Sequence, residues 1–422
     1  MCVYVYTVIM SIFAAIGLLI SLVALITFIN QLTIKAPVTI AVAFSAMVLS
    51  LLCLLLAALN IPTIENEAQT ILSQVQFDNL LLNGLLGPLL FAGSFSLDLT
   101  SVKKHAAEIT SLSAISTVVS AALVTVILYY GCQLLGIHLP LIWCFMFGAL
   151  ISPTDPVAVL AIFKHYNVTE SLKTRISGES LFNDGVGIVL FLSGFGLLSA
   201  HSSLTAWSAI EIFLRETVCG LIYGWLLGWG IGKLGQFAPQ KQPLLFLTLA
   251  AATGGFVLAN YFEFSGALAM VSCGMTVRHY FKGHTTRSKI PFLSMIWNLI
   301  EDMLNAVLFL LIGFELLVIN VTPARLAIMA ATVIILLLIR LMSVAPVLWW
   351  FHNAREDYRK VLALFTWGGL RGGLAVALAL SLPLGANRVF ILSLTYAVVA
   401  FSITVQGFTL QPVVEHFKKP AD

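Results

Sequence analysis

Charged side chains are scarce in this sequence. They make up 10% of its 422 residues, whereas 59% of the residues are hydrophobic. An ordinary soluble domain carries about one quarter charged residues. The mean hydropathy is +1.00, and a chain of this size in water would still need polar groups to cover its surface. The shortage of charge therefore excludes a water-soluble globular protein and predicts a chain that is largely surrounded by lipid.

Other familiar signals are missing as well. The net charge is only +3 and no basic run occurs, which argues against a nucleic-acid partner. The six cysteines have neither metal-ligand spacing nor the pattern of a disulfide framework. No Walker-type glycine-rich loop, Gly-x-Ser-x-Gly or His-Glu-x-x-His motif is present. We therefore expect no cofactor, no nucleotide-driven pump and no enzyme.

Long apolar runs are what the sequence does contain. A bilayer core about 30 Å thick needs roughly 20 apolar residues per helix. Because the runs are apolar on nearly every face, they indicate helices and not the alternating strands of a barrel. The predicted segments are 7–29, 37–60, 79–97, 110–135, 139–163, 176–200, 207–232, 243–262, 265–281, 296–320, 325–351, 361–383 and 387–412. The sequence thus predicts an all-α polytopic membrane protein of about 13 transmembrane helices, with residues 1–422 forming one membrane domain.

Lysine and arginine predict the orientation of these helices. The connections after odd-numbered segments, together with the C-terminal end, hold 17 of the 22 basic residues, whereas residues 61–78 hold none. Basic residues favour the cytoplasmic side. The N-terminus is therefore expected outside the cell membrane and the C-terminus in the cytoplasm. The first segment lacks the positive flank of a signal peptide, so we expect it to remain as a helix.

Two of the predicted segments should be interrupted. Segment five contains Pro153 and Pro156 on either side of Thr-Asp, and proline removes a backbone hydrogen bond from a helix. Segment twelve contains four glycines and an arginine in the run 368–373, which is also poor helix. The breaks lie seven segments apart. This spacing predicts two inverted six-helix repeats, residues 1–200 and 243–418, joined by a linker helix at 207–235. Paired broken helices at matching positions are typical of a transporter's binding site near mid-membrane.

Charge inside these segments is a second signal, because charge in a bilayer is costly and usually functional. Five residues meet this test clearly, namely Asp155, Glu179, Asp184, Arg340 and Arg371. Arg340 is a candidate partner for Glu179, as an architectural clamp or next to a bound ion, and Arg371 can neutralise the carbonyl ends of the broken helices. Two further acids, Glu301 and Asp302, are expected near the membrane interface.

Segment six places the chemistry most clearly. On a helix, Ser180 and Asp184 share one face, and Glu179 and Asn183 share the adjoining one. A carboxylate, a hydroxyl and the freed carbonyls of a broken helix are hard oxygen ligands, which suit a small alkali cation. A carboxylate that binds such a cation can bind a proton instead. The pattern therefore predicts exchange of a cation for a proton on Asp184.

Three motifs carry a family resemblance: Ile151-Ser-Pro-Thr-Asp-Pro-Val-Ala-Val159, Gly178-Glu-Ser-Leu-Phe-Asn-Asp-Gly-Val186 and Gly369-Leu-Arg-Gly-Gly373. In this order they resemble the cation/proton antiporter-1 family, which includes bacterial NhaP-type exchangers and animal sodium/hydrogen exchangers. The thirteen-segment plan extends the resemblance over nearly the whole chain.

The resemblance implies a Na⁺ or Li⁺ site at Thr154, Ser180 and Asp184, with Glu179 close by and paired with Arg340. It also implies a role for Asp155 and Arg371 at the helix crossing, and a homodimer with a moving six-helix core. Asn183 stands where electrogenic relatives carry a second aspartate, which favours electroneutral exchange. Segment three reads Leu89-Leu-Phe-Ala-Gly-Ser-Phe95, whereas many relatives have an acid soon after Leu-Phe.

Other functions stay open at this point. Potassium/proton exchange is the main alternative, since selectivity among hard cations depends on cavity size and ligand number. A cation channel would also place polar residues in broken helices, but it would not need a protonatable carboxylate. An intramembrane hydrolase is less favoured, because the sequence contains no matching constellation of catalytic residues.

Overall fold

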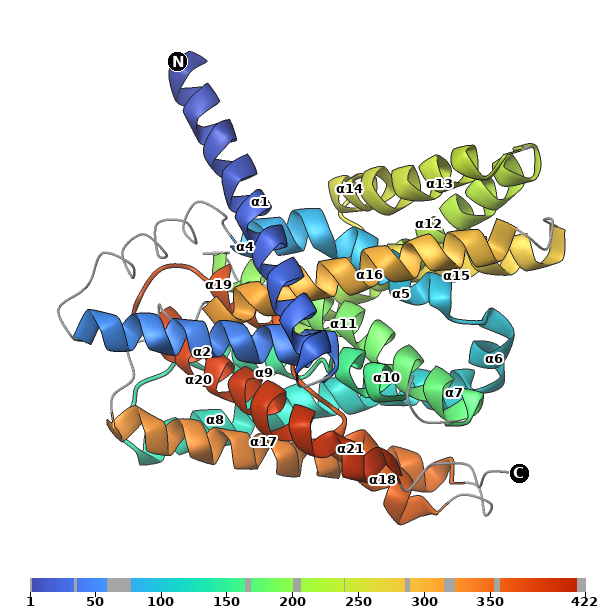
Figure 1. Cartoon of the computed structure of the whole chain (residues 1–422). Coiled ribbons are helices and arrows are strands. Elements are labelled where there is room, and N and C mark those ends of the chain that lie inside the picture. Colours follow the sequence, from blue (N-terminus) through green and yellow to red (C-terminus); the bar gives the residue numbers. More distant parts are fainter. Residues whose placement is uncertain are drawn as a thin grey trace.

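The computed structural model describes residues 2–33, 36–58, 77–163, 168–199, 206–238, 240–284, 289–314, 323–352 and 357–415 (Figure 1). Within these ranges every regular element is helical and no β-strand occurs. Each of the thirteen predicted segments coincides with a helix or with helices that follow one another closely, so the predicted fold class is confirmed. Seven stretches are long and apolar enough to cross a membrane: Val38–Leu56, Ala106–Leu134, Glu170–Leu198, Lys241–Tyr261, Ile290–Phe314, Arg325–Trp350 and Ala386–Glu415.

One group of helices lies for the most part in the upper half of Figure 1. It consists of α1 (Cys2–Leu32), α2 (Val38–Ala58), α4 (Phe77–Asn79), η1 (Leu80–Leu85), α5 (Leu86–Ser96), α12 (Ala206–Gln236), α13 (Lys241–Ala250), η3 (Ala251–Gly255), α14 (Phe256–Tyr261), α15 (Gly266–His284) and α16 (Lys289–Phe314). Helix α15 packs along α12 and α5, and α16 packs along α2 and α5. Their shared core includes Phe91, Phe95 and Trp297, which are fully buried.

A second group contains both interrupted helices. It consists of α6 (Leu99–Lys104), α7 (Ala106–Thr110), η2 (Ser111–Ile115), α8 (Ser116–Leu134), α9 (Leu141–Ile151), α10 (Val157–Phe163), α11 (Glu170–Ser199), α17 (Pro323–Trp350), α18 (Tyr358–Trp367), α19 (Gly373–Leu380), α20 (Ala386–Phe401), η5 (Ser402–Gln406) and α21 (Gly407–Glu415). Helix α9 packs between α8 and α11, and α17 packs against α8, α18 and α20. Helix α11 also contacts α12 and α15, so it joins the two groups.

The two predicted helix breaks are present. Residues 152–156 separate α9 from α10, and residues 368–372 separate α18 from α19. In the first break the cause is proline, which cannot donate the hydrogen bonds that would continue α9. In the second it is glycine, which loses more conformational freedom in a helix than any other residue.

The boundaries of segment ten differ from the prediction. Helix α16 starts at Lys289, seven residues before the predicted start at 296. Glu301 and Asp302 therefore lie well inside the helix and line a cavity, and the expectation of an interfacial position is corrected. The sequence pattern indicates a later start because Lys289, Pro291 and Ser294 interrupt the apolar run there. Other residues used for the orientation, including Lys35, Glu65, Glu67 and Arg287, lie outside the described ranges.

Candidate functional site

The two helix breaks meet in the middle of the second group. The backbone N–H of Asp155 donates to the carbonyl oxygen of Leu370 at 2.8 Å, which forms one antiparallel bridge between the breaks. The carboxylate of Asp155 accepts from the N–H of Val157 at 2.9 Å and so covers the start of α10. A Cβ atom at Gly372 would collide with this carboxylate. Glycine is therefore required there for the two extended segments to approach each other.

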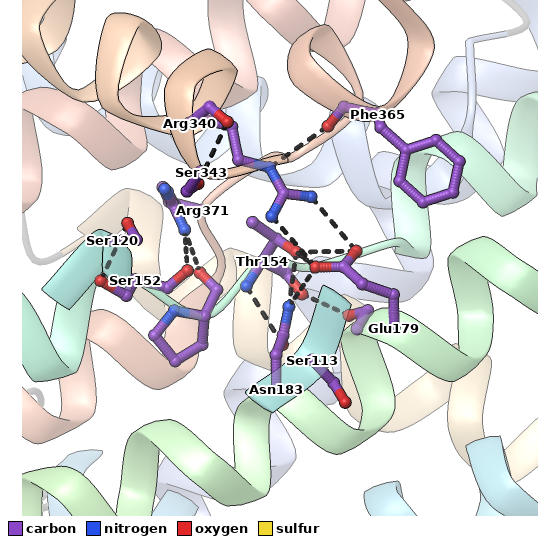
Figure 2. A network of polar contacts seen from close by, with 12 residues as sticks. Ser113, Ser120, Ser152, Thr154, Glu179, Asn183, Arg340, Ser343, Phe365 and Arg371 are labelled. Atoms are coloured by element: carbon purple, nitrogen blue, oxygen red, sulfur yellow. Dashed lines mark hydrogen bonds and ion pairs between the residues drawn. The ribbon is translucent and has the colours of Figure 1, made fainter. Parts of the chain in front are cut away.

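Arg371, in the second helix break, also binds the first helix break. Its Nη1 donates to the carbonyl oxygens of Ser152 and Pro153, the latter at 2.6 Å (Figure 2). These carbonyls follow the C-terminal end of α9, where the helix dipole places partial negative charge. Arg371 is 4% exposed. The predicted neutralisation of a broken helix end is thus visible as direct hydrogen bonds.

The C-terminal end of α18 has its own polar partners, which come from η5. The Nε2 of Gln406 donates to the carbonyl oxygen of Trp367 at 3.1 Å. Ser402 donates to Oε1 of Gln406 at 2.6 Å and accepts from the backbone N–H of Arg371 at 3.3 Å. Sequence reasoning missed both residues. Their signal was two polar side chains four residues apart in an apolar segment, which is the spacing of one helix face.

Glu179 lies at the centre of a closed polar cluster (Figure 2). Arg340 donates to both of its carboxylate oxygens, at 3.0 and 3.2 Å. Asn183 donates to Oε1 at 2.8 Å, and the hydroxyl of Thr154 lies 3.4 Å from each oxygen. Glu179 and Arg340 are 2% and 3% exposed. Every lone pair that points inward is occupied, which is the condition under which a buried ion pair is tolerated.

The remaining polar atoms of this cluster are also used. Arg340 Nε donates to the carbonyl oxygen of Phe365 at 3.3 Å, which ties α17 to α18. Asn183 donates to the Thr154 hydroxyl at 2.8 Å and accepts from the Thr154 backbone N–H at 3.3 Å. The cluster therefore connects α11, α17, α18 and the first break. None of Glu179, Asn183 and Arg340 lines the cavity described next.

Asp184 faces a large cavity between the two helix groups. The cavity has a volume of ≈ 1430 Å³, and its lining includes Thr154, Asp155, Ser180 and Asp184. Ser180 and Asp184 share this face of α11, as the helical spacing predicts. Among the described residues Asp184 has no hydrogen-bond or ion-pair partner, whereas Glu179 on the same helix has four donors. Asp184 is therefore the carboxylate that can exchange one small ligand for another.

The three residues that the resemblance implies as cation ligands are only partly assembled. The hydroxyl of Ser180 donates to the carbonyl oxygen of Thr154. The Thr154 hydroxyl points toward Glu179 and Asn183, so its side chain belongs to the closed cluster (Figure 2). The oxygens left to accept a cation at the cavity are a carboxylate, a hydroxyl and a main-chain carbonyl. All three are hard ligands that suit an alkali cation.

Comparison with known proteins agrees with this architecture. The family model described as "Sodium/hydrogen exchanger, transmembrane" matches residues 18–416. The chain belongs to this family. The match spans both helix groups and both breaks, so the sodium/hydrogen exchanger family accounts for almost the entire chain.

Individual relatives cover similar lengths. The chain is 38% identical over 403 residues to the Na⁺/H⁺ antiporter NhaP of Pseudomonas aeruginosa, with 94% of each protein covered. It is 30% identical over 388 residues to the Na⁺/H⁺ antiporter NhaH of Halobacillus dabanensis, which covers 90% of this chain and 92% of that protein. The structure of the sodium proton antiporter MjNhaP1 of Methanocaldococcus jannaschii matches with a TM-score of 0.73 at 16% identity, over 97% of this chain and 99% of that one. This last match shows that the fold is shared.

Proposed function

We propose that this protein is a secondary active transporter that exchanges Na⁺ or Li⁺ for H⁺ across a cell membrane, in support of pH and sodium homeostasis. The observation that carries the proposal is Asp184, an acid that faces a cavity at the helix crossing with no partner among the described residues. Family membership supports the same substrates, and the relatives NhaP and NhaH are named as Na⁺/H⁺ antiporters. The protein is not an enzyme and needs no cofactor, because the ion gradients supply the energy.

The proposed cation site consists of Asp184, Ser180 and Thr154. Asp184 supplies the charge, Ser180 its hydroxyl oxygen, and Thr154 its main-chain carbonyl. Asp155 adds negative charge at the same end of the cavity without leaving its hydrogen bond to Val157. Na⁺ and H⁺ compete for Asp184, since a protonated carboxyl cannot bind the cation well.

Exchange follows from this competition combined with alternating access. The site moves across the membrane barrier when Asp184 holds either a cation or a proton, because a bare carboxylate in that barrier costs several kcal/mol or more. One proton is then exchanged for one cation, which makes the cycle electroneutral. The cluster of Glu179, Asn183 and Arg340 keeps its charges paired throughout, and it acts as a clamp that holds the first break against α17 and α18.

The cavity indicates which side of the membrane this conformation faces. Its lining includes residues of the connections near 30–39, 96–101 and 170–174, together with Arg278. The predicted orientation places all of these at the cytoplasm, with the N-terminus outside and the C-terminus inside. With that orientation, we propose that this conformation is inward-facing. We further propose a homodimer in which the helices of the first group form the fixed interface and those of the second group move.

The decisive experiment is proton movement in everted membrane vesicles with a pH-sensitive dye. Na⁺, Li⁺ and K⁺ are added in turn to wild type and to Asp184→Asn. We expect Na⁺ and Li⁺ to collapse the proton gradient in wild type and no cation to do so in the variant. We also expect the Na⁺ concentration for half-maximal exchange to rise as the pH falls, since protons occupy the same carboxylate.

Two results would change the proposal. If only K⁺ moves protons, the mechanism stands and the substrate is potassium. If Asp184→Asn exchanges as well as wild type, or if Na⁺ crosses without proton movement, then Asp184 is not the exchange site and a cation channel becomes the better description.

A further inference from the structure

The cavity that ends at Asp184 contains a second group of polar residues, on α16. One face of this helix lines the cavity with Asn298, Glu301, Asp302 and Asn305. These positions are three or four residues apart, so they lie along one side of the helix. Asn298 is engaged with Ser96 on α5, whose hydroxyl donates to Oδ1 at 2.9 Å. The other three residues have no role in the site described so far.

Glu301 lies against the opposite wall of the cavity at a point where α5 has no side chain. A methyl group placed on Gly93 would be 3.9 Å from Oε1 of Glu301 and 3.3 Å from Cδ1 of Leu181. Gly93 is thus the position at which α5, α11 and the Glu301 carboxylate come together. Leu181 is three residues before Asp184 on α11, which corresponds to about 4.5 Å along the helix axis. Glu301 therefore lies roughly one helical turn from Asp184 in depth.

Helix α11 shows on which side of Asp184 this point lies. Its cavity-lining residues run from Glu170 and Lys173 at the start of the helix, through Thr174 and Ser177, to Asp184. Leu181 is on this path, between the mouth and Asp184. An ion that enters from the mouth must pass the level of Glu301 before it reaches Asp184.

Asn305 adds an independent sign that this stretch binds something. It is 2% exposed and lines the cavity, yet it has no hydrogen-bond partner among the described residues. Its amide therefore keeps hydrogen-bonding capacity for a ligand in the cavity. On a helix the Cβ atoms of Glu301 and Asn305 are about 5–6 Å apart. One cation can therefore contact a carboxylate oxygen of Glu301 and the amide oxygen of Asn305 together.

The charges that line the cavity fit a cation and not an anion. Acidic side chains outnumber basic ones along the wall: Asp98, Asp155, Glu170, Asp184, Glu301 and Asp302 against Lys173 and Arg278. Lys173 pairs with Glu170 at 2.9 Å, and Asp98 pairs with Lys282 at 2.9 Å. Acidic residues thus outnumber basic ones by six to two along the wall, which favours a cation over an anion.

We propose that Glu301 and Asn305 form a transit site, in which a partly hydrated alkali cation binds weakly on its way between the cavity mouth and Asp184. The proposal rests on the function proposed above. The transit site sets how readily Na⁺ reaches Asp184 and leaves the exchange step itself unchanged.

The first test is a Na⁺ titration of exchange in everted vesicles. Glu301→Gln removes a charged ligand, so we expect it to raise the Na⁺ concentration for half-maximal exchange by about fivefold or more. Asn305→Ala removes a neutral ligand and should raise this concentration by about threefold. In both variants the maximal rate at saturating Na⁺ should stay within about twofold of wild type, because Asp184 and the exchange step are unchanged. Glu301→Asp keeps the carboxylate and restores most of the affinity. Glu170→Gln is the matched control, because it removes the same charge from the mouth of the same cavity. We expect this variant to leave the Na⁺ titration unchanged.

The second test measures binding without transport. In purified Asp184→Asn protein, the ²³Na NMR line width reports weak Na⁺ binding, with choline chloride keeping the ionic strength constant. We expect excess line width in Asp184→Asn and in Asp184→Asn/Glu170→Gln, and its loss in Asp184→Asn/Glu301→Gln.

The outcomes separate the two proposals. If Glu301→Gln titrates like wild type, or if Glu170→Gln shifts the titration equally, the transit site is wrong and only the general field of the cavity matters. Equal line widths in Asp184→Asn with and without Glu301→Gln also overturn it. If Asp184→Asn itself exchanges Na⁺ for protons, the failure lies in the proposed exchange site.

Discussion

Glu179 and Asp184 lie five residues apart on α11, and the structure treats them in opposite ways. Glu179 is 2% exposed and is bound by Arg340, Asn183 and Thr154. Asp184 faces a cavity of ≈ 1430 Å³ and has no hydrogen-bond partner among the described residues. Five residues on a helix correspond to a rotation of about 140°, so the two carboxylates point to different sides of α11.

The comparison separates two uses of buried charge in one membrane protein. A carboxylate that is fully paired joins helices, and removing one partner leaves the other charge buried and uncompensated. In the proposed mechanism, a carboxylate that faces the cavity without an internal partner binds a cation or a proton in turn. The same residue type would then contribute to stability in one place and to exchange in the other. The following variants test this division.

The largest difference is expected between Glu179→Gln and Asp184→Asn. Glu179→Gln leaves the Arg340 charge unpaired inside the protein and should lower the free energy of unfolding by about 3–5 kcal/mol. Asp184→Asn changes no internal hydrogen bond and should leave the thermal midpoint in detergent unchanged while it stops exchange. Thermal unfolding monitored by size-exclusion chromatography measures the first effect, and vesicle assays measure the second. Equal destabilisation by both variants would remove the distinction.

Combining Glu179→Gln with Arg340→Met should recover much of the lost stability. The amide oxygen of Gln still accepts from Asn183, and Met fills the volume without a charge. Besides the hydrogen bonds between Arg340 and Glu179 themselves, the donor to the Phe365 carbonyl oxygen is lost, at a cost of about 1 kcal/mol. The double variant should melt closer to wild type than either single variant and should retain Na⁺-dependent proton movement. If it is stable but silent, then the pair takes part in ion exchange and is more than a clamp.

Thr154 lies on the border between the two environments. Thr154→Val removes the hydroxyl that contacts Glu179 and Asn183 but keeps the main-chain carbonyl that faces Ser180. We expect a loss of about 1–2 kcal/mol in stability, with the Na⁺ concentration for half-maximal exchange within about threefold of wild type, which is less than 1 kcal/mol. Thr154→Ser serves as the control that keeps the hydroxyl. A tenfold or larger loss of Na⁺ affinity with unchanged stability would place the hydroxyl at the ion.

A loss of stability similar to that of Thr154→Val is expected at Gln406. Gln406→Leu removes the donor to the carbonyl oxygen of Trp367 and the acceptor for Ser402, and should cost about 1 kcal/mol of stability for each hydrogen bond lost. Gln411→Leu, at an exposed position of α21, is the matched control and should stay within about 0.5 kcal/mol of wild type. Equal melting of the two variants would mean that the end of α18 needs no partner from η5.

Much of the site was predictable because its signals are local. Proline and glycine in segments five and twelve interrupt helices in any surroundings, and five charges in apolar segments stand out against their neighbours. The spacing of Ser180 and Asp184 also gave their common face correctly. Ser402, Gln406 and Asn305 were missed, because a polar residue in an apolar segment has a meaning only once its neighbours on other helices are known.

By itself, the sequence determined that the chain is a helical membrane protein with two broken helices and a charged centre. These properties depend on the polarity of each segment and on backbone chemistry, which act within a few residues of the chain. Only the tertiary structure decided which carboxylate is paired and which faces the cavity, because that depends on how α11 is rotated against α16 and α17. The periodicity of α11 separates Glu179 from Asp184, but the packing of helices more than a hundred residues away gives Glu179 its arginine and leaves Asp184 facing the cavity.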